Sequence, residues 1–230
     1  MNFHGLQKMT LLDYPGKVAC TLFTGGCNMR CPFCHNALLV TGLQEAEVIP
    51  EEEILSFLKK RTGILDGVAV TGGEPLLMPD IIEILKKIKS LGYSIKLDTN
   101  GTFPDRLQEI INLRLADYVA VDIKNSKEKY PETVGVPDFD ISPVEKTVEI
   151  LKNGNIDYEF RTTVTREFHS VESIRKAAEW IKGADKYFLQ AFVDSGNLIA
   201  EGIHGVSKEE MEEMKKAAEQ FIDRVEIRGV

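Results

Sequence analysis

The chain has 230 residues, with 28 Lys and Arg against 36 Asp and Glu and a net charge of −8. Surfaces that bind nucleic acid usually carry a basic face, so this balance argues against a nucleic-acid partner and leaves a protein partner open. A chain of this length can form one α/β domain or two small ones. No low-complexity linker divides it, and a single domain over residues 1–230 is predicted.

Neither a membrane segment nor a disulfide framework is expected. No apolar run approaches the roughly 20 residues that span a bilayer. The first eight residues lack the basic leader and the apolar block of a signal peptide. Three of the four cysteines fall within one short motif, which does not suggest paired structural cysteines. These features predict a cytoplasmic protein.

Strand-like and helix-like segments alternate along the chain. Short β-rich runs are expected at 17–24, 67–71, 93–98, 117–124, 157–165 and 186–192, with a last short strand at 224–228. Helical spacing is found at 51–61, 79–91, 104–113, 171–182 and 208–222, and a further helix begins at 142. Ser142, followed by Pro143 and Glu145, is predicted to cap its helix. Ser207 and Glu210 predict a second capping box.

This alternation predicts the fold class. Six strand–helix units in a row favour an α/β fold with a parallel sheet and right-handed crossovers. A partial (βα)6 barrel, with a parallel curved sheet and outer helices, fits the count, and a doubly wound sheet is the alternative. In both folds ligands bind at the C-terminal ends of the strands.

Three closely spaced cysteines follow the first predicted strand of this series. Cys27, Cys31 and Cys34 can hold three irons of a cubane cluster and leave the fourth iron open, whereas electron-transfer clusters use four cysteines. The alternative is a structural zinc site, which needs four nitrogen or sulfur ligands. Cys20 lies in an apolar run and His35 directly adjoins Cys34, so neither is a good fourth ligand. The spacing favours the iron–sulfur cluster.

Other unusual residues also follow or end predicted strands. They are Gly72-Gly73-Glu74-Pro75, Asp98-Thr99-Asn100-Gly101, Asp122-Ile123-Lys124, Arg161 and Gln190. Each has a purely structural interpretation: Gly-Gly and Asp-Thr-Asn-Gly are good turn sequences, and the charged residues could pair with one another. If each had only a structural role, all of them would have fallen on one rim of the sheet by chance. Together they therefore predict a binding site at the C-terminal ends of the strands.

The paired motifs resemble those of a known superfamily. The CxxxCxxC loop, with aromatic Phe33 before the last cysteine and GGEP after the next strand, resembles the radical S-adenosylmethionine superfamily. Residues 11–17 (LLDYPGK) and Cys34-His35-Asn36 resemble the activating enzymes of glycyl-radical enzymes, most closely the activator of anaerobic ribonucleoside-triphosphate reductase. The chain lacks the extra cysteine clusters of a ferredoxin-like insert, which agrees with that branch.

The resemblance implies cofactors and the residues that bind them. Cys27, Cys31 and Cys34 would bind a [4Fe-4S] cluster whose open iron is chelated by S-adenosylmethionine. Phe33 would lie near the adenine, and the backbone of Gly72, Gly73 and Glu74 would receive the methionine amino group. Asp98, Thr99 and Asp122 match positions around the cofactor carboxylate, with a monovalent cation. Lys124 and Arg161 match cofactor-contacting or rim positions, and Asp13 would face the incoming substrate. Val193 stands where the pyruvate formate-lyase activator has a histidine.

The resemblance also implies a reaction. Reductive cleavage of S-adenosylmethionine would give a 5′-deoxyadenosyl radical that abstracts a glycine Cα hydrogen and installs a glycyl radical. The partner would be a glycyl-radical enzyme, the large subunit of anaerobic ribonucleotide reductase, with a flavodoxin- or ferredoxin-type reductant. No general base is needed, and His4, His169 and His204 receive no role. The alternatives are activation of a pyruvate formate-lyase-like enzyme, radical chemistry on a small molecule, and a non-catalytic zinc module.

Overall fold

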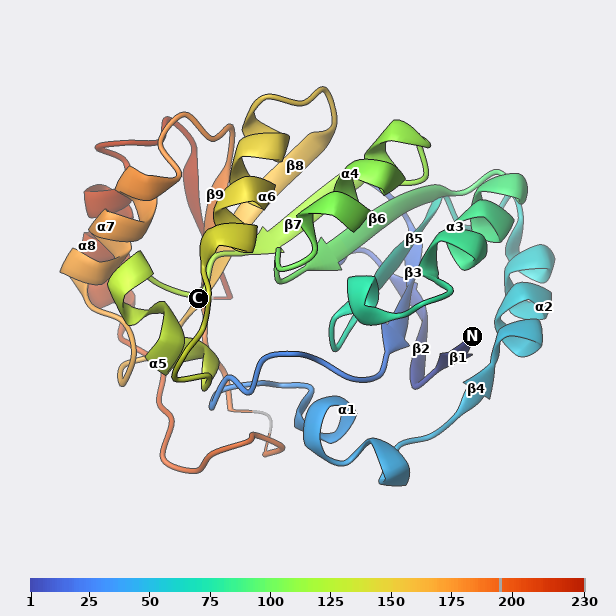
Figure 1. The fold of residues 1–230 in the computed structure, drawn as a ribbon, viewed down its shortest axis with the longest axis horizontal. Helices are drawn as coiled ribbons and strands as arrows, with labels where there is room; N and C mark the ends of the chain where they lie inside the picture. Colours follow the sequence, from blue (N-terminus) through green and yellow to red (C-terminus); the bar gives the residue numbers. More distant parts are fainter. Residues whose placement is uncertain (195, 230) are drawn as a thin grey trace. The chain divides into compact units, whose positions relative to one another are not determined.

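The computed structural model describes residues 1–194 and 196–229 (Figure 1). Contacts within the chain divide it into two compact units. The first unit comprises Met1–Asn28, Leu38–Thr99 and Phe103–Val119. The second comprises Met29–Ala37, Asn100–Thr102 and Ala120–Val230. The expectation of a single domain over residues 1–230 stays a prediction.

The first unit contains a sheet with three parallel strands and one antiparallel edge strand. Its order is β6 (Ser94–Thr99), β5 (Gly67–Gly72), β3 (Ala19–Thr24) and β2 (Gly5–Thr10). β3 is parallel to β5 and β5 is parallel to β6, whereas β2 runs antiparallel to β3 with an irregularity between Gln7 and Thr10. A separate antiparallel pair joins β1 (Asn2–Phe3) to β4 (Ile49–Pro50).

Burial on both faces explains the sequences of the parallel strands in this unit. The central residues of β5 are apolar and almost fully buried, and Leu22 in β3 is fully buried. Strands covered on both faces become nearly continuous apolar runs instead of alternating ones. The helices and turns of this unit are η1 (Leu43–Glu45), α2 (Glu51–Arg61), η2 (Pro75–Leu77), α3 (Ile81–Ser90) and α4 (Pro104–Asn112). α1 (Ala37–Thr41) begins in the second unit.

The second unit contains a parallel sheet in the order β10 (Val225–Arg228), β9 (Tyr187–Ala191) and β8 (Asp157–Val164). Tyr187 is in register with Phe160 of β8 and with Val225 of β10. β7 (Tyr118–Asp122) begins in the first unit and ends in the second. The helices and turns are η3 (Lys127–Lys129), α5 (Tyr130–Val134), α6 (Ser142–Lys152), α7 (Val171–Trp180) and α8 (Lys208–Ala218). α8 packs on α7, β9 and β10.

The sequence-based elements are largely confirmed. Each β-rich run and each helical segment named above corresponds to a strand or helix of the structure, with ends that differ by a few residues. β1, β2, β4, α1 and α5 were not expected. The capping box of Ser207 and Glu210 is confirmed, with both of its hydrogen bonds present.

The predicted cap of α6 is wrong. Ser142 is the first helical residue and not the residue before the helix. Its backbone N–H donates to Asp140 Oδ1 at 3.0 Å and its hydroxyl donates to Asp140 Oδ2 at 2.9 Å. A carboxylate two residues upstream therefore accepts the hydrogen bonds that mark this N-terminus, because an ionised acceptor is stronger than a hydroxyl.

The described helices are short. α2, α6 and α8 have 11 residues each. At about 1.5 Å per residue they span roughly half of a bilayer's hydrocarbon core. No helix in the described part of the chain is both long enough and apolar enough to cross a membrane.

Candidate functional site

Backbone contacts join the ends of β3 and β5 in the first unit. The N–H of Gly73 donates to Thr24 O at 2.9 Å, and the N–H of Glu74 donates to Gly26 O at 2.8 Å. A Cβ on Gly73 would lie 1.9 Å from Gly26 O, and one on Gly72, at φ +116°, would lie 2.4 Å from the backbone of Thr24. Only glycine permits this approach. The loop that carries Cys27 is thereby fixed to the GGEP turn.

This geometry defines how the GGEP turn could receive a ligand. The N–H groups of Gly73 and Glu74 already donate to the neighbouring loop, and an amino group needs an acceptor. A methionine amino group would therefore bind backbone carbonyl oxygens here. The contact itself stays a prediction.

The side chain of Glu74 has a scaffold position. It is fully buried, and its Oε1 accepts hydrogen bonds from the N–H of Leu76 at 3.0 Å and from the hydroxyl of Thr99 at 2.8 Å. It therefore ties the end of β5 to the end of β6. Arg106 of α4 donates to the carbonyls of Leu76 and Pro79, which fixes the 3-10 turn after GGEP.

Asp98 and Asp13 both have partners on the strands of the first unit. Lys96, two residues before Asp98 and on the same face of β6, forms a buried ion pair with it. Asp13 accepts a hydrogen bond from the hydroxyl of Thr21 in β3 at 2.5 Å. The two residues before Asp13 point to solvent: Leu11 is 68% and Leu12 is 89% exposed.

In the second unit, residues Met29–Ala37 carry Cys31 and Cys34. The N–H of Cys34 donates to Cys31 O at 3.0 Å, so a single turn connects these two cysteines. The N–H of Arg30 donates to Val134 O at 2.8 Å. Gly135 follows at φ +66°, and a Cβ there would lie 2.4 Å from Arg30 O. The C-terminus of α5 therefore packs directly on the loop backbone.

Aromatic side chains support the same loop. The buried ring of Phe33 lies 5.7 Å from Phe168 and 6.1 Å from His169, centroid to centroid. His35 stacks on Phe192 at 5.2 Å, and Val193 beside it is 64% exposed. The predicted contact of Phe33 with an adenine stays a prediction.

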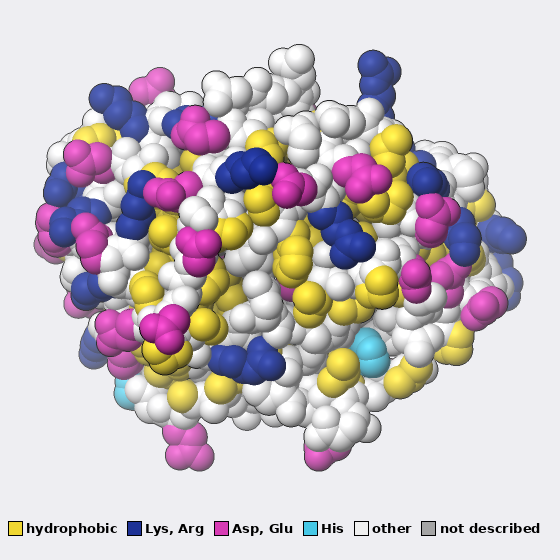
Figure 2. Space-filling model, in the orientation of Figure 1, with side chains coloured by type: hydrophobic (Ala, Val, Ile, Leu, Met, Phe, Trp, Pro, Cys, Tyr) yellow, Lys and Arg dark blue, Asp and Glu magenta, His cyan; other side chains and the backbone are white. Residues whose placement is uncertain are grey.

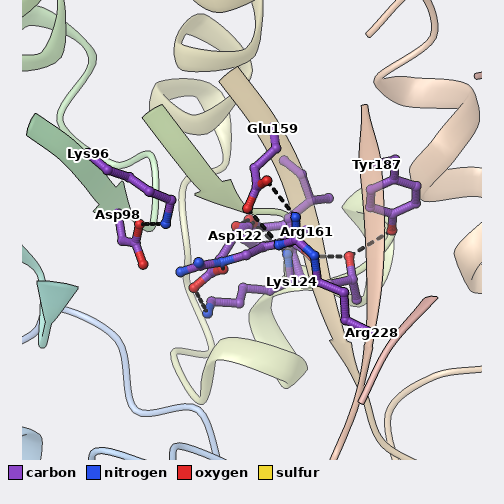
Figure 3. Close-up of polar contacts among 11 residues, drawn as sticks. Lys96, Asp98, Asp122, Lys124, Glu159, Arg161, Tyr187 and Arg228 are labelled. Atoms are coloured by element: carbon purple, nitrogen blue, oxygen red, sulfur yellow. Dashed lines mark hydrogen bonds and ion pairs between the residues drawn. The ribbon is translucent and has the colours of Figure 1, made fainter. Parts of the chain in front are cut away.

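A charged cluster ends β7. Asp122 Oδ2 accepts from Lys124 Nζ at 2.9 Å, and its Oδ1 pairs with the Nε of Arg161 in β8 (Figure 3). Burial alone would raise the pKa of Asp122, but the two cations outweigh it and hold that pKa well below its usual range. Burial would likewise lower the pKa of Lys124, and the charge of Asp122 instead raises it above its usual range. All three groups are ionised at neutral pH, which leaves one net positive charge suited to a carboxylate.

His169, which the sequence left without a role, connects this cluster to the cysteine loop. Its Nδ1 accepts from the N–H of Thr165 at 3.1 Å, so its Nε2 carries the proton and donates to Lys124 O at 2.8 Å. Burial lowers the pKa of His169 to about 4, which keeps the ring neutral. No sequence pattern marks this role, because its partners lie 4 and 45 residues away.

The cysteines are the predicted ligands of an iron–sulfur cluster. None of the four described cysteines is in a disulfide, and three of them share one loop. Cys20 is fully buried, and burial raises its pKa to about 12, which agrees with its interpretation as a core residue. Burial also raises the pKa of Cys34, although the nearby charge of Lys124 opposes this. Among the described residues no three His, Cys, Asp or Glu side chains are arranged as a metal site, so the three-cysteine ligand set stays a prediction.

A family comparison decides the class of protein. Residues 21–181, which include the cysteine loop, GGEP and the charged cluster, match the model of the radical SAM superfamily. The chain belongs to this superfamily. Radical SAM proteins use a [4Fe-4S] cluster and S-adenosylmethionine, and these are the cofactors of this enzyme. The free thiols and the net positive charge beside Asp122 fit the two groups.

Curated relatives include activating enzymes. A Methanocaldococcus jannaschii protein named as a glycyl-radical enzyme activating enzyme is 33% identical over 98% of this chain and 95% of its own length. The pyruvate formate-lyase-activating enzyme of Clostridium pasteurianum is 35% identical, over 53% of this chain and 52% of its own length. This radical SAM chain therefore spans about half of that second relative.

Solved structures confirm the fold prediction. Streptococcus suis SuiB has a TM-score of 0.66 at 15% identity, over 91% of this chain and 48% of SuiB. The enzyme anSMEcpe, solved with bound AdoMet, has a TM-score of 0.61 at 18% identity, over 89% of this chain and 62% of its own. The predicted α/β radical SAM fold, a parallel curved sheet with outer helices, is confirmed.

Proposed function

We propose that this radical SAM enzyme activates a glycyl-radical enzyme, and that its target is the large subunit of anaerobic ribonucleoside-triphosphate reductase. The observation that carries the proposal is the match to the Methanocaldococcus jannaschii protein, which extends over nearly the whole of both chains. The choice of the reductase rests on the resemblance of the DYPG segment and of Cys34-His35-Asn36. A pyruvate formate-lyase-like target is the second candidate, supported by similarity to two pyruvate formate-lyase-activating enzymes.

The cofactors and the chain divide the work. When bound, the cluster and S-adenosylmethionine supply one-electron cleavage of a carbon–sulfur bond and abstraction of a hydrogen atom. The side chains of Asp122, Lys124 and Arg161 supply a fixed charge arrangement for the cofactor carboxylate. The packed aromatic rings of Phe33 and Phe168 help to exclude water beside the cysteine turn. No side chain needs to move a proton in this scheme.

The target and the reductant bind at the surface. On the face drawn in Figure 2, Lys and Arg side chains lie among Asp, Glu and apolar side chains. A protein partner on that face would be recognised by local contacts more than by a field of one sign. We propose a flavodoxin or ferredoxin as reductant and the cytoplasm as location, since free thiols suit a reducing compartment. A monovalent cation remains part of the proposal.

The test is anaerobic incubation of the reconstituted enzyme with dithionite, S-adenosylmethionine and each candidate target protein. Electron paramagnetic resonance should show a glycyl signal with the reductase and a much weaker one with a pyruvate formate-lyase. The reverse pattern would reassign the target. If 5′-deoxyadenosine accumulates with an added small molecule and no protein partner, the activase proposal is wrong.

Paired cysteine variants test the ligand set. Cys31→Ala should abolish cluster assembly, seen as loss of iron, sulfide and visible absorbance, with the fold retained by circular dichroism. Cys20→Ala is the matched control and should keep nearly the full cluster. Loss of the cluster in both variants, or one zinc and no sulfide in the native protein, would contradict the assignment.

A further inference from the structure

Two acidic and two basic side chains meet around β8 in the second unit. Glu159 and Arg161 are two residues apart on β8, so both project from the same face of the sheet. Arg161 pairs with Asp122, as described above. Arg228 lies at the end of β10, where its Cα is in register with Gln190 of β9. Figure 3 shows Glu159 and Arg228 beside the Asp122 cluster.

Glu159 and Arg228 form a bidentate pair. Arg228 Nη1 donates to Glu159 Oε1 and Nη2 donates to Oε2, both at 2.9 Å. The side chain of Glu159 is only 1% exposed. The guanidinium of Arg228 also lies 3.4 Å from the centroid of the Phe188 ring. Such a fork-to-fork pair over an aromatic ring fixes the arginine in one orientation.

A buried carboxylate needs a cation, and two arginines are within reach of this one. If Arg228 were absent, Glu159 would be left without its bidentate partner, which is strongly unfavourable in a buried position. Arg161 lies two residues along β8 on the same face as Glu159. We expect its side chain to turn toward position 159. Arg161 would then move away from Asp122, and the carboxylate of Asp122 would keep only Lys124.

We propose that Arg228 is a positioning residue for the cofactor site: by binding Glu159 it reserves Arg161 for Asp122. This rests on the proposed function only in assigning Asp122 and Arg161 to S-adenosylmethionine binding. Arg228 touches neither Asp122 nor Lys124 in this arrangement, and acts through Glu159 and Arg161. The residue lies outside the stretch that matches the superfamily model.

The experiment measures S-adenosylmethionine binding to the reconstituted, oxidised enzyme by equilibrium dialysis, without target protein or turnover. Arg228→Met should weaken binding about tenfold. Glu159→Gln alone should change binding less than about twofold, because a neutral amide no longer competes for Arg161. The double variant Glu159→Gln/Arg228→Met should return to within about twofold of the native enzyme.

The double variant separates the proposal from a purely structural role of Arg228. If the loss came from the missing contact with Phe188, Glu159→Gln would not rescue it, and failure of rescue overturns the proposal. Binding of native strength in Arg228→Met also overturns it. Should Arg228→Met not fold, Arg228→Lys with its Glu159→Gln partner gives the same test, with an expected loss of two- to threefold.

A variant of Arg161 tests whether Arg228 acts on the cofactor site through Arg161. In an Arg161→Met background, Arg228→Met should have no additional effect on binding, since Arg161 is the residue it positions. If Arg228→Met weakened S-adenosylmethionine binding as much in this background as in the native enzyme, Arg228 would not act through Arg161. Because no glycyl-radical enzyme is present, these results stand whether or not the activase proposal is correct.

Discussion

The two units hold their predicted site residues in different ways, the first by backbone contacts and the second by ion pairs. In the first unit, the backbone of Gly73 contacts the backbone of Gly26, and the buried side chain of Glu74 makes structural hydrogen bonds. In the second unit, the side chains of Asp122, Lys124 and Arg161 carry the chemistry and are held by a charge network. The first part should therefore be sensitive to added volume and the second to changed charge. Four substitutions test that contrast, beginning with the largest expected effect.

Gly73→Ala should be the most damaging change, because its Cβ would meet Gly26 O at 1.9 Å. We expect a loss of at least about 3 kcal/mol in the free energy of unfolding, measured by urea denaturation. Gly63→Ala is the matched control: it has φ +78° and no atom within 4 Å of its Cβ, and should lose only about 1 kcal/mol. Equal losses would show that volume is not what Gly73 avoids.

Asp122→Asn keeps the shape of the side chain and removes its charge. Lys124 and Arg161 would then repel each other without a counter-ion, and we expect a loss of about 2 to 3 kcal/mol at pH 7. The pKa of Asp122 is lowered in the folded state, so its contribution is present above the unfolded pKa of roughly 4 and lost as the pH falls further. The variant should lack that acid-dependent loss in urea unfolding between pH 7 and pH 3.

The control for Asp122→Asn is Glu172→Gln, whose exposed pair with Arg175 should make no measurable contribution to the free energy of unfolding. If both substitutions cost the same, the cluster behaves as an ordinary surface ion pair. The contrast between the two units would then fail.

His169→Gln tests the neutral imidazole that donates a hydrogen bond to the backbone carbonyl of Lys124. The folded pKa of His169 is about 4 and the unfolded value is roughly 6.5, so its contribution is fully present above pH 6.5 and declines toward pH 4. The native protein should therefore lose about 2 kcal/mol more than the variant between pH 7 and pH 4.5. A His169 variant that retains the native pH profile would refute this role.

Thr99→Val should have the smallest effect. It removes the 2.8 Å hydrogen bond to the buried Glu74 and keeps the side-chain volume, for a loss of about 1 kcal/mol. Thr62→Val, at an exposed helix end, should change unfolding by less than about 0.5 kcal/mol. A large loss at Thr99 would mean that the first unit depends on side-chain polarity as much as the second.

The parallel core was predictable because each strand buries both faces. The apolar run at 67–71 could therefore be recognised without knowledge of its neighbours. β2 was missed because its central residues Gln7, Lys8 and Met9 are all exposed and show no alternation. α5 was missed because five residues are too few for a helical period.

The residues of the site were more predictable than the hydrogen bonds and ion pairs between them. The pairing of Asp122 with Lys124 could be predicted from the sequence, because side chains two residues apart along a strand lie on the same face. Glu159 and Arg228 are 69 residues apart, and their contact depends on the register of three strands. The ligand contact expected at Gly73 stays a prediction, and the structure shows the backbone of Gly26 packed against this glycine. Local sequence shows that space is needed and cannot show what fills it.

The irregular edge strand β2 has a consequence for how the enzyme behaves at high concentration. A straight edge strand presents a row of free backbone groups to which another chain can add, and this is a common route to aggregation. Here the pairing with β3 is interrupted between Gln7 and Thr10, at a point where Lys8 and Met9 are exposed. A bulge with a lysine twists the edge and makes addition of a further strand unfavourable. Straightening this edge, more than weakening the core, is therefore the change expected to make the purified protein polymerise.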